Sequence, residues 1–432
     1  MRIAMIGWEY PPFITGGLGV HCYELTRALA LLGVEVDFYM PRAKGAGVFK
    51  ITESGILEIN ETEKEGIRIV GIRGIKNFYG GYEPDLRSET ILKKLFERQK
   101  INIDSGGAIG ELYGGDFFGK VDLYNKKVAE LVAKMNEFRK YNLIHAHDWL
   151  TIRGALEART LTGLPVVLTI HATEYDRAPV PWDKIHNVEI RGVKEADRVI
   201  AVSNRTKAQL VDKMGGNPNK IKVVYNGVDS SKFNIRKRKE RNTVLFLGRL
   251  TDQKGPFQFL GAAKEVLNQY KDVRFLIVGK GPLMPLLIEE AFRMGIQNNV
   301  IFMGFVPENF LRKAYSQSDV YVMPSVSEPF GITALEALSS GTPLVISKST
   351  GVGESIRHCF KVDFWDTKLM AEKIIALLKF EVLHKEIAKN GMKEAQKFNW
   401  IKVAEKTIQV YREVVRNPGP VLELKSERVK TK

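Results

Sequence analysis

The sequence predicts an α/β protein of two Rossmann-like domains, each built on a parallel sheet, that face each other across a cleft. The first observation is length, because 432 residues exceed what one hydrophobic core usually organises. The second is a regular alternation of short apolar runs with helical patterns, which is typical of right-handed βαβ units. The third is that this alternation restarts after the basic segment at residues 236–241.

The first alternation runs from Arg2 to Tyr225. We expect its strands at Arg2–Ile6, Val34–Met40, Leu143–Ala146, Val166–Ile170, Val199–Ser203 and Ile221–Tyr225. We expect its helices at Leu18–Leu32, Val121–Phe138, Thr151–Leu161, His186–Ala196 and Asn204–Lys213. Residues 44–118 are less regular and rich in Gly and aromatic residues, so they predict an insertion with a hairpin near Ile67–Ile72.

The second alternation predicts strands at Thr243–Leu247, Arg274–Val278, Val300–Met303, Val320–Met323 and Leu344–Ile346. It predicts helices at Pro256–Gln269, Pro285–Met294, Glu308–Ser316 and Ile332–Leu338. Further helices follow Thr367, and the last, Trp400–Val415, is expected to cross back to the first domain. We therefore divide the chain into domains at 1–217 and 218–398, followed by the crossing helix and a basic tail at 399–432.

The net charge of +15 suits either a polyanionic partner or a pocket for a diphosphate. The basic clusters at 236–241 and 425–432 lack the interleaved aromatic residues of single-strand binders, so we interpret them as solvated segments and expect no nucleic acid partner. No apolar run approaches the ~20 residues needed to span a bilayer. Cys22 and Cys359 are the only cysteines, which excludes a disulfide framework. We expect a cytoplasmic protein without a membrane anchor.

A glycine-rich turn follows the first predicted strand. Gly16 and Gly17 lie there, directly before a predicted helix. Glycine lets the backbone approach a ligand closely, and a helix N-terminus offers free amides to an anion. The run is not a full dinucleotide-binding fingerprint, so a purely structural turn and a phosphate or sugar contact both remain open.

Two cations follow the strand Thr243–Leu247, namely Arg249 and Lys254. Fixed cations at the carboxyl end of a strand can neutralise a diphosphate leaving group, as a metal does elsewhere. We therefore expect no metal cofactor. The alternative interpretation is that both are exposed charges on a loop.

Two carboxylates, Glu328 and Glu336, lie eight residues apart in the segment from Glu328 to Glu336. Glu328 is at a Pro/Gly turn, and Glu336 falls about two turns into the following helix. Carboxylates accept hydrogen bonds from the vicinal hydroxyls of ribose or glucose. The start of the helix provides further candidates for ligand contact, which are Gly331, Ile332 and Thr333. A surface position for Glu336 remains an alternative.

The run His145–Trp149 ends a predicted strand. His145 and His147 point to one face, which suggests a metal, but no third ligand lies at a zinc-motif spacing, so a metal is not favoured. Structural hydrogen bonding and substrate contact through Asp148 remain open. His171 follows the strand Val166–Ile170, at the end where parallel sheets bind ligands. The alternative is a core histidine whose hydrogen bonds are made within the protein.

In combination these motifs resemble retaining glycosyltransferases of the GT-B fold, specifically the glycogen and starch synthases of glycosyltransferase family 5 and the neighbouring family 4. The resemblance extends over nearly the whole chain. Its strongest parts are His145–Trp149, Asn226–Asp229, Gly248–Leu250 with Lys254–Gly255, and Glu328–Glu336. It implies that residues 218–398 bind a nucleotide sugar and that residues 1–217 form the acceptor side.

The resemblance also implies roles for individual residues. Gly16 and Gly17 would lie against the diphosphate and sugar of the donor, and Arg249 and Lys254 would hold that diphosphate as it leaves. His171 and Glu328 would contact the glucosyl unit, and Asp148 would lie near the glucosyl or acceptor site. Glu336 would contact the ribose hydroxyls. The anomeric configuration would be retained by same-face attack. The alternative of a glycosidase-type double displacement needs a nucleophile on the opposite face, for which no residue is an obvious candidate.

One departure from the family concerns the donor. Glycogen and starch synthases often carry Lys two residues before the Gly pair, where this chain has Ile14. The choice between ADP-glucose and UDP-glucose therefore remains open. The presence of a second glutamate, Glu336, favours family 4 over family 5.

We expect glucosyl transfer to the non-reducing end of an α-1,4-glucan or maltooligosaccharide. The alternatives are a family 4-like transferase acting on a small sugar, a sugar phosphate or a lipid-linked sugar, then a nucleotide-sugar epimerase, and last a non-catalytic nucleic-acid binder.

Overall fold

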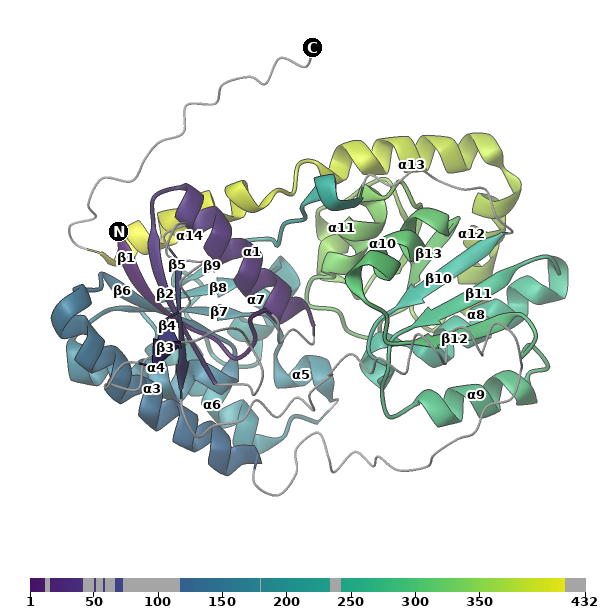
Figure 1. Cartoon of the computed structure of the whole chain (residues 1–432). Coiled ribbons are helices and arrows are strands. Elements are labelled where there is room, and N and C mark those ends of the chain that lie inside the picture. The colour runs from purple at the N-terminus through teal and green to yellow at the C-terminus, as the bar shows by residue number, and fades with distance from the viewer. Residues whose placement is uncertain are drawn as a thin grey trace, which may run out of the picture.

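The computed structural model describes residues 1–11, 16–41, 50–51, 57–58, 67–72, 117–178, 180–233 and 242–415. Two α/β domains lie side by side (Figure 1). Each contains its own parallel sheet, which confirms the predicted Rossmann-like pair. Both basic clusters lie outside the described residues, as does Ile14.

The first domain has a seven-stranded parallel sheet in the order β5-β2-β1-β6-β7-β8-β9. Its strands are β1 (Arg2–Ile6), β2 (Glu35–Pro41), β5 (Ile67–Ile72), β6 (Leu143–His147), β7 (Val166–Ile170), β8 (Arg198–Ala201) and β9 (Ile221–Val223). Its helices are α1 (Gly17–Leu31), α3 (Phe117–Arg139), α4 (Trp149–Thr162), α5 (Glu174–Arg177), α6 (Asp183–Glu195) and α7 (Asn204–Asp212). Helices α3, α4 and α6 cover one face of the sheet, and α1 covers the other.

The expected hairpin near Ile67–Ile72 is wrong. These residues form β5, which pairs in parallel with β2, with Ile67 beside Val36. An ion pair between Arg68 and Asp37, with a nitrogen–oxygen distance of 2.8 Å, fixes the register at this edge. The strand therefore extends the main sheet. A separate short antiparallel pair consists of β3 (Lys50–Ile51) and β4 (Leu57–Glu58), and the rest of the expected insertion before residue 117 lies outside the described residues.

The second domain has a six-stranded parallel sheet in the order β12-β11-β10-β13-β14-β15. Its strands are β10 (Thr243–Leu247), β11 (Arg274–Val278), β12 (Val300–Gly304), β13 (Val320–Met323), β14 (Leu344–Ser347) and β15 (Phe360–Val362). Its helices are α8 (Pro256–Gln269), α9 (Met284–Arg293), α10 (Glu308–Gln317), α11 (Ile332–Ser339), α12 (Thr367–Lys379) and α13 (Glu381–Ala395). Separate apolar clusters fill the two faces of the sheet.

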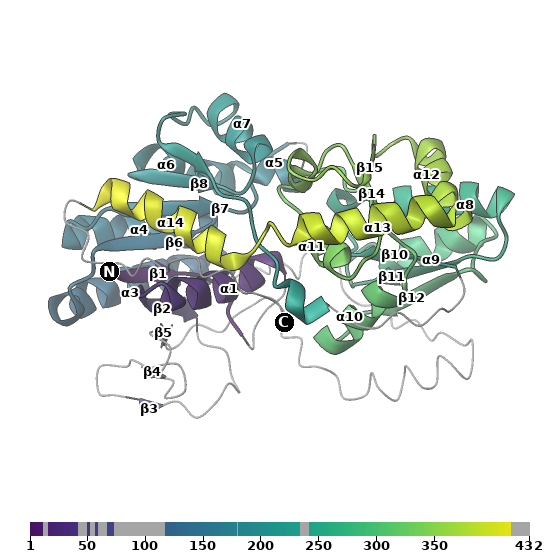
Figure 2. The same cartoon turned by 90° about the horizontal axis from the view of Figure 1, so that it is seen from above.

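The last described helix, α14 (Trp400–Val414), returns to the first domain (Figure 2). The side chain of Asn399 caps it by accepting a hydrogen bond from the amide of Lys402. Its apolar face, which includes Trp400 and Tyr411, shares a core cluster with β1 and α1. The first sheet itself continues past residue 217, because β9 pairs with β8.

The loops at the carboxyl ends of the two sheets meet. Ser203, after β8, lies so close to Gly351, after β14, that a Cβ on Gly351 would be 2.7 Å from the Cβ of Ser203. Open parallel sheets bind ligands at the carboxyl ends of their strands. The fold therefore places the candidate residues of both domains around one interdomain site.

Candidate active site

Two helix N-termini from different domains face each other at this site. Helix α1 begins at Gly17 and α11 begins at Ile332, and a Cβ on Gly17 would lie 3.7 Å from the terminal methyl carbon of Ile332. Gly331 has φ of 104°, in the region that favours glycine. The first amides of a helix have no partner within the helix and attract anions. The arrangement is suited to a diphosphate.

An ion pair lies beside these helix ends. Lys254 Nζ is 2.6 Å from Glu328 Oε2, and the two side chains are only 20% and 11% exposed. The turn after Lys254 requires glycine, because Gly255 has φ of 70° and a Cβ there would be 2.1 Å from the carbonyl oxygen of Pro324. Backbone hydrogen bonds hold Glu328 in place, from its amide to Ser349 and from Gly351 to its carbonyl. The loops after β10 and β13 thus present one cation and one anion together.

Arg249 also follows β10, as predicted. Its side chain is exposed and forms no ion pair with any residue in the described part of the chain. The structure therefore leaves this guanidinium available at the surface near the turn that holds Lys254.

Glu336 lies within α11 and is half-buried. The hydroxyl of Tyr315 donates a 2.8 Å hydrogen bond to Glu336 Oε2, and burial raises the pKa of this carboxyl to about 7. The surface alternative for Glu336 is thus excluded. Nearby, the hydroxyl of Thr333 accepts a hydrogen bond from Tyr321 at 2.9 Å.

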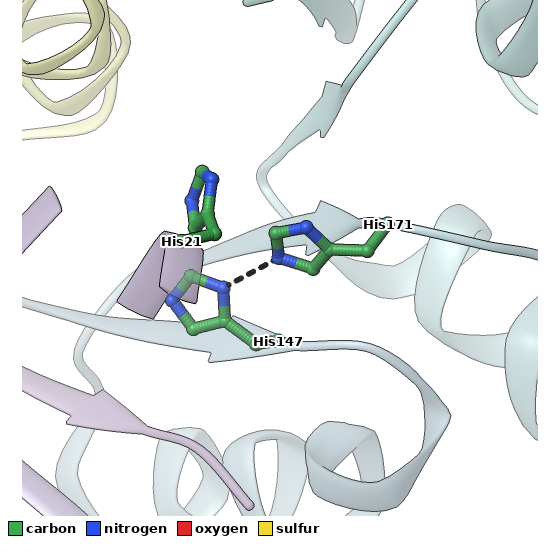
Figure 3. A group of neighbouring side chains, drawn as sticks. All are labelled: His21, His147 and His171. Atoms are coloured by element: carbon green, nitrogen blue, oxygen red, sulfur yellow. Dashed lines mark hydrogen bonds between the residues drawn. The ribbon is translucent and has the colours of Figure 1, made fainter. Parts of the chain in front are cut away.

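Three histidines gather in the first domain (Figure 3). His147 Nδ1 and His171 Nε2 are 3.0 Å apart, and His21, from α1, packs edge-on with its ring centroid 4.4 Å from that of His171. Burial lowers the pKa of His171 to about 3 and the pKa values of His21 and His147 well below their usual range. These rings are therefore neutral at physiological pH.

His145 shares the face of β6 with His147, as predicted, but its nitrogens are used elsewhere. Its Nδ1 is 2.7 Å from the hydroxyl of Tyr411, and its Nε2 is 2.7 Å from the hydroxyl of Thr169. His145 therefore links the sheet to α14, which is a structural role.

Asp148 is buried and holds the loop that carries His171. Its Oδ1 accepts a 2.7 Å hydrogen bond from the amide of His171, and burial raises its pKa to about 6. The backbone of Asp148 has φ of 57° and ψ of 176°, a conformation that non-glycine residues rarely adopt. Strain of this kind is often retained at functional sites, here directly before α4.

Sequence reasoning missed the contacts that join the two domains beside Glu328. The hydroxyl of Ser327 donates to Asp176 Oδ1 at 2.7 Å, and Arg205 donates to the Ser327 oxygen at 3.0 Å. The carboxylate of Glu354 accepts hydrogen bonds from the amides of Asn204 and Arg205 at the start of α7. No sequence pattern pairs these residues, because each contact spans more than 100 positions.

Sequence reasoning also missed His21 and its contact with Asn226, whose Oδ1 is 2.7 Å from His21 Nδ1, although the run Asn226–Asp229 was part of the resemblance. The only available signal was the position of His21 one turn after Gly17, on the same helix face.

The two Rossmann-like domains, with candidate residues of both around one interdomain site, have the architecture expected from the sequence. Comparison with known families agrees, since residues 228–394 match the model described as glycosyl transferases group 1 and residues 109–232 match glycosyltransferase family 4. The chain is 30% identical over 436 residues to an uncharacterised glycosyltransferase of Methanocaldococcus jannaschii, covering 95% of this chain and 98% of that protein. The protein belongs to the group 1 glycosyltransferases.

Two further relatives have named activities. The chain is similar to a glycogen synthase of Mycobacterium tuberculosis, with 28% identity over 365 residues, covering 82% of this chain and 80% of the relative. It is also similar to a D-inositol 3-phosphate glycosyltransferase of Segniliparus rotundus, with 29% identity over 307 residues, covering 65% and 68% respectively.

Solved structures share the fold. The sucrose-phosphate synthase of Thermosynechococcus elongatus superposes with a TM-score of 0.72 at 20% identity, covering 95% of this chain and 98% of that chain. The catalytic domain of starch synthase IV from Arabidopsis thaliana, bound to ADP and acarbose, superposes with a TM-score of 0.67 at 17% identity, covering 96% and 99%. These likenesses confirm the GT-B architecture. Among the described helices, none has the length and apolar character needed to cross a membrane.

Proposed function

We propose that this protein is a glycogen synthase, which transfers glucose from ADP-glucose or UDP-glucose to the non-reducing end of an α-1,4-glucan with retention of configuration. The observation that carries the proposal is the meeting of the N-termini of α1 and α11 beside the Lys254–Glu328 pair. The similarity to a glycogen synthase over 82% of the chain supports the choice of glucan as acceptor.

The diphosphate of the donor would lie between the two helix N-termini. The amides of Gly16 and Gly17 approach from one side and those of Gly331 and Ile332 from the other. Lys254 and Arg249 supply the positive charge that stabilises the diphosphate as the glycosidic bond to glucose breaks. In this proposal the reaction requires no metal ion.

Carboxylates would bind the hydroxyl groups of the donor. Glu328 accepts from the glucose and Glu336 accepts from the ribose, with Tyr315 holding the Glu336 carboxylate in position. The carbonyl and ring of His171 face the glucosyl unit. Asp148 acts on this contact indirectly, because its carboxylate fixes the amide of His171.

The acceptor hydroxyl would attack from the face that the leaving phosphate occupies. The departing phosphate oxygen then takes the proton of this hydroxyl, so the enzyme needs no general base. Consistent with this, the pKa of His171 is lowered to about 3, which makes its neutral ring a weak proton acceptor near pH 7. The role of the protein is to position both substrates and to stabilise the diphosphate.

The test is transfer of radiolabelled glucose from ADP-glucose and from UDP-glucose, each with glycogen and without an acceptor. Label in a precipitable polymer that amylase degrades supports the proposal, and the two rates identify the donor. Intact donor with no labelled polymer contradicts it.

A second candidate is glycosyl transfer to a small phosphorylated acceptor, favoured by the similarity to D-inositol 3-phosphate glycosyltransferases. The same assay with inositol phosphate in place of glycogen tests it. Donor that is consumed without any acceptor would instead indicate an epimerase.

A further inference from the structure

We propose that His21, His147 and His171 form a binding site for a divalent transition-metal ion of the class that prefers imidazole, with Zn²⁺ as the probe. One ring nitrogen from each histidine lies within 4.8 Å of those of the other two. The residues come from three separate elements, namely α1, the end of β6 and the loop after β7, and their rings converge (Figure 3).

The distances are near those of a metal site. Tetrahedral zinc with Zn–N bonds of about 2.0–2.1 Å places its ligand nitrogens about 3.3 Å apart. His147 Nδ1 and His171 Nε2 are already 3.0 Å apart, so they need to separate by only a few tenths of an ångström. The nitrogen of His21 lies within 4.8 Å of the other two, so it has to approach them by at most about 1.5 Å.

A metal also constrains where the protons of these rings lie, because only a ring nitrogen without a proton has a lone pair to donate. In the hydrogen bond between His147 and His171, one ring donates its proton to the nitrogen of the other. Metal binding requires that this proton move to the other nitrogen of the same ring, so no proton has to be lost.

Two observations beyond proximity point to a ligand. The Nε2 atom of His21 is buried and has no hydrogen-bond partner among the described residues. In addition, His21 Nδ1 is 2.7 Å from the side-chain oxygen of Asn226. When this nitrogen donates to Asn226, the lone pair of His21 remains on Nε2, and a partner of this kind is what orients metal-binding histidines.

The three imidazole ligands determine which metal ions the site would bind. Three imidazoles favour Zn²⁺, Cu²⁺ or Ni²⁺ over Mg²⁺ or Ca²⁺, which prefer oxygen ligands. His145 does not contribute, since both of its nitrogens have other partners. His171 is the least buried of the three, so the open coordination position would face the cleft.

An effect of the bound metal on glycosyl transfer is also expected, and this expectation rests on the proposed function. His171 is the residue that we assign to the glucosyl unit of the donor, and a metal bound to its ring removes that contact. Transition-metal ions should therefore inhibit transfer in competition with the nucleotide sugar, while the reaction itself proceeds without metal.

The direct test is binding of Zn²⁺ by titration calorimetry to the full chain, prepared without a polyhistidine tag and treated with chelator. The visible spectrum of Co²⁺ in the same site gives a second readout that does not depend on activity. We expect one ion per chain and a tetrahedral Co²⁺ spectrum. The variant Asn226→Ala should weaken binding about 10-fold, since loss of a partner to a ligand typically costs 10–100-fold in affinity. The variant His21→Gln removes the ligand itself, so the loss should reach at least the upper end of that range, about 100-fold.

The variant His358→Gln is the matched control, because it removes a more exposed histidine that pairs with Glu394 outside the site. It should bind Zn²⁺ as the unaltered protein does. Absence of binding to the unaltered protein, an octahedral Co²⁺ spectrum, or equal binding by His21→Gln would each overturn the proposal. Binding with no effect on donor affinity would leave the metal site standing and contradict the role assigned to His171.

Discussion

The two domains contribute to the candidate site in different ways. In the second domain, Glu328, Gly331 and Glu336 come from one continuous segment that turns and enters α11. In the first domain, His147 and His171 lie 24 residues apart at the ends of neighbouring strands, and His21 comes from α1, more than 100 residues upstream. A site in one segment keeps its spacing in the sequence and is therefore recognisable there, whereas a site assembled by the fold is visible only in the structure.

The largest effect that tests this comparison is expected in the second domain. Replacing Lys254 by Ala removes a cation from the proposed diphosphate site and leaves Glu328 without its partner. We expect the rate of transfer to fall about 10²–10³-fold, as when one electrostatic group of a catalytic site is removed. Steady-state kinetics measure the loss, and circular dichroism checks the fold.

The control is Lys348→Ala, which breaks an exposed ion pair with Asp363 in the same domain. Exposed pairs contribute little, so this variant should keep its activity. Full activity of the Lys254 variant would remove this lysine from the proposed site.

The next effect concerns the first domain. The variant Asp148→Ala removes the acceptor for the amide of His171, which leaves a buried donor unpaired at a cost of about 1–3 kcal/mol. Displacement of the His171 loop should lower transfer about 10-fold to 100-fold. Denaturant unfolding and kinetics measure the two effects.

Asp148→Asn separates the two properties of this side chain, since the amide oxygen still accepts a hydrogen bond but carries no charge. We expect it to recover most of the stability and activity. The control Asp122→Ala removes an exposed carboxylate paired with Arg153 and should change neither. An Asn variant as impaired as the Ala variant would show that the charge of Asp148 matters, and that its hydrogen bond does not account for the effect.

The third prediction concerns pH and the second domain. The pKa of Glu336 is raised to about 7 in the folded protein, above its ordinary value of 4.5. The folded protein therefore binds a proton more tightly, so the stability that this group contributes is full below pH 4.5 and is lost as the pH rises through 7. Glu336→Gln should be more stable than the unaltered protein at pH 8, and the difference should shrink towards pH 4.5.

The measurement is the free energy of unfolding of the unaltered protein and of Glu336→Gln from pH 4.5 to pH 8. Subtracting one from the other removes the contribution of other buried carboxyls such as Glu189, whose pKa is also raised to about 7. The same variant should bind the nucleotide more weakly, because it loses the charged acceptor for the ribose. A stability difference that does not vary with pH would contradict the raised pKa of Glu336.

The sequence predicted most of the fold because buried parallel strands are short apolar runs bounded by turns. Strands β7, β10, β11 and β13 have the expected ends. The short strand β15 (Phe360–Val362) was not predicted. The orientation of β5 was wrong because its partner β2 is distant in the sequence, and only the structure pairs them.

The candidate site was predictable where one segment carries it. The Glu328–Glu336 spacing indicated both carboxylates, and the structure adds the partners Lys254 and Tyr315. The histidine cluster was not predictable, because the metal hypothesis for His145 and His147 needed a third ligand at motif spacing. The neighbours of His147 are instead His21 and His171, brought together by α1 and β7.

The smallest expected effect tests how the two sides are joined. Ser327 of the second domain donates to Asp176 of the first, one residue before Glu328. The variant Ser327→Ala removes this bond, and a typical hydrogen bond contributes about 0.5–1.5 kcal/mol. Because the bond lies between the domains, its loss should raise KM for the nucleotide sugar a few-fold, while kcat changes little.

The control is Ser230→Ala, which removes a hydroxyl contact with Ser339 within the second domain and should leave KM unchanged. Small-angle scattering with and without nucleotide should then show a more open Ser327 variant, because the domains have lost a contact beside the donor site. Equal KM values and equal scattering profiles for the two variants would mean that the two domains are coupled through other contacts. The next to test is Glu354 of the second domain, whose carboxylate accepts a hydrogen bond from the amide of Asn204 at the start of α7.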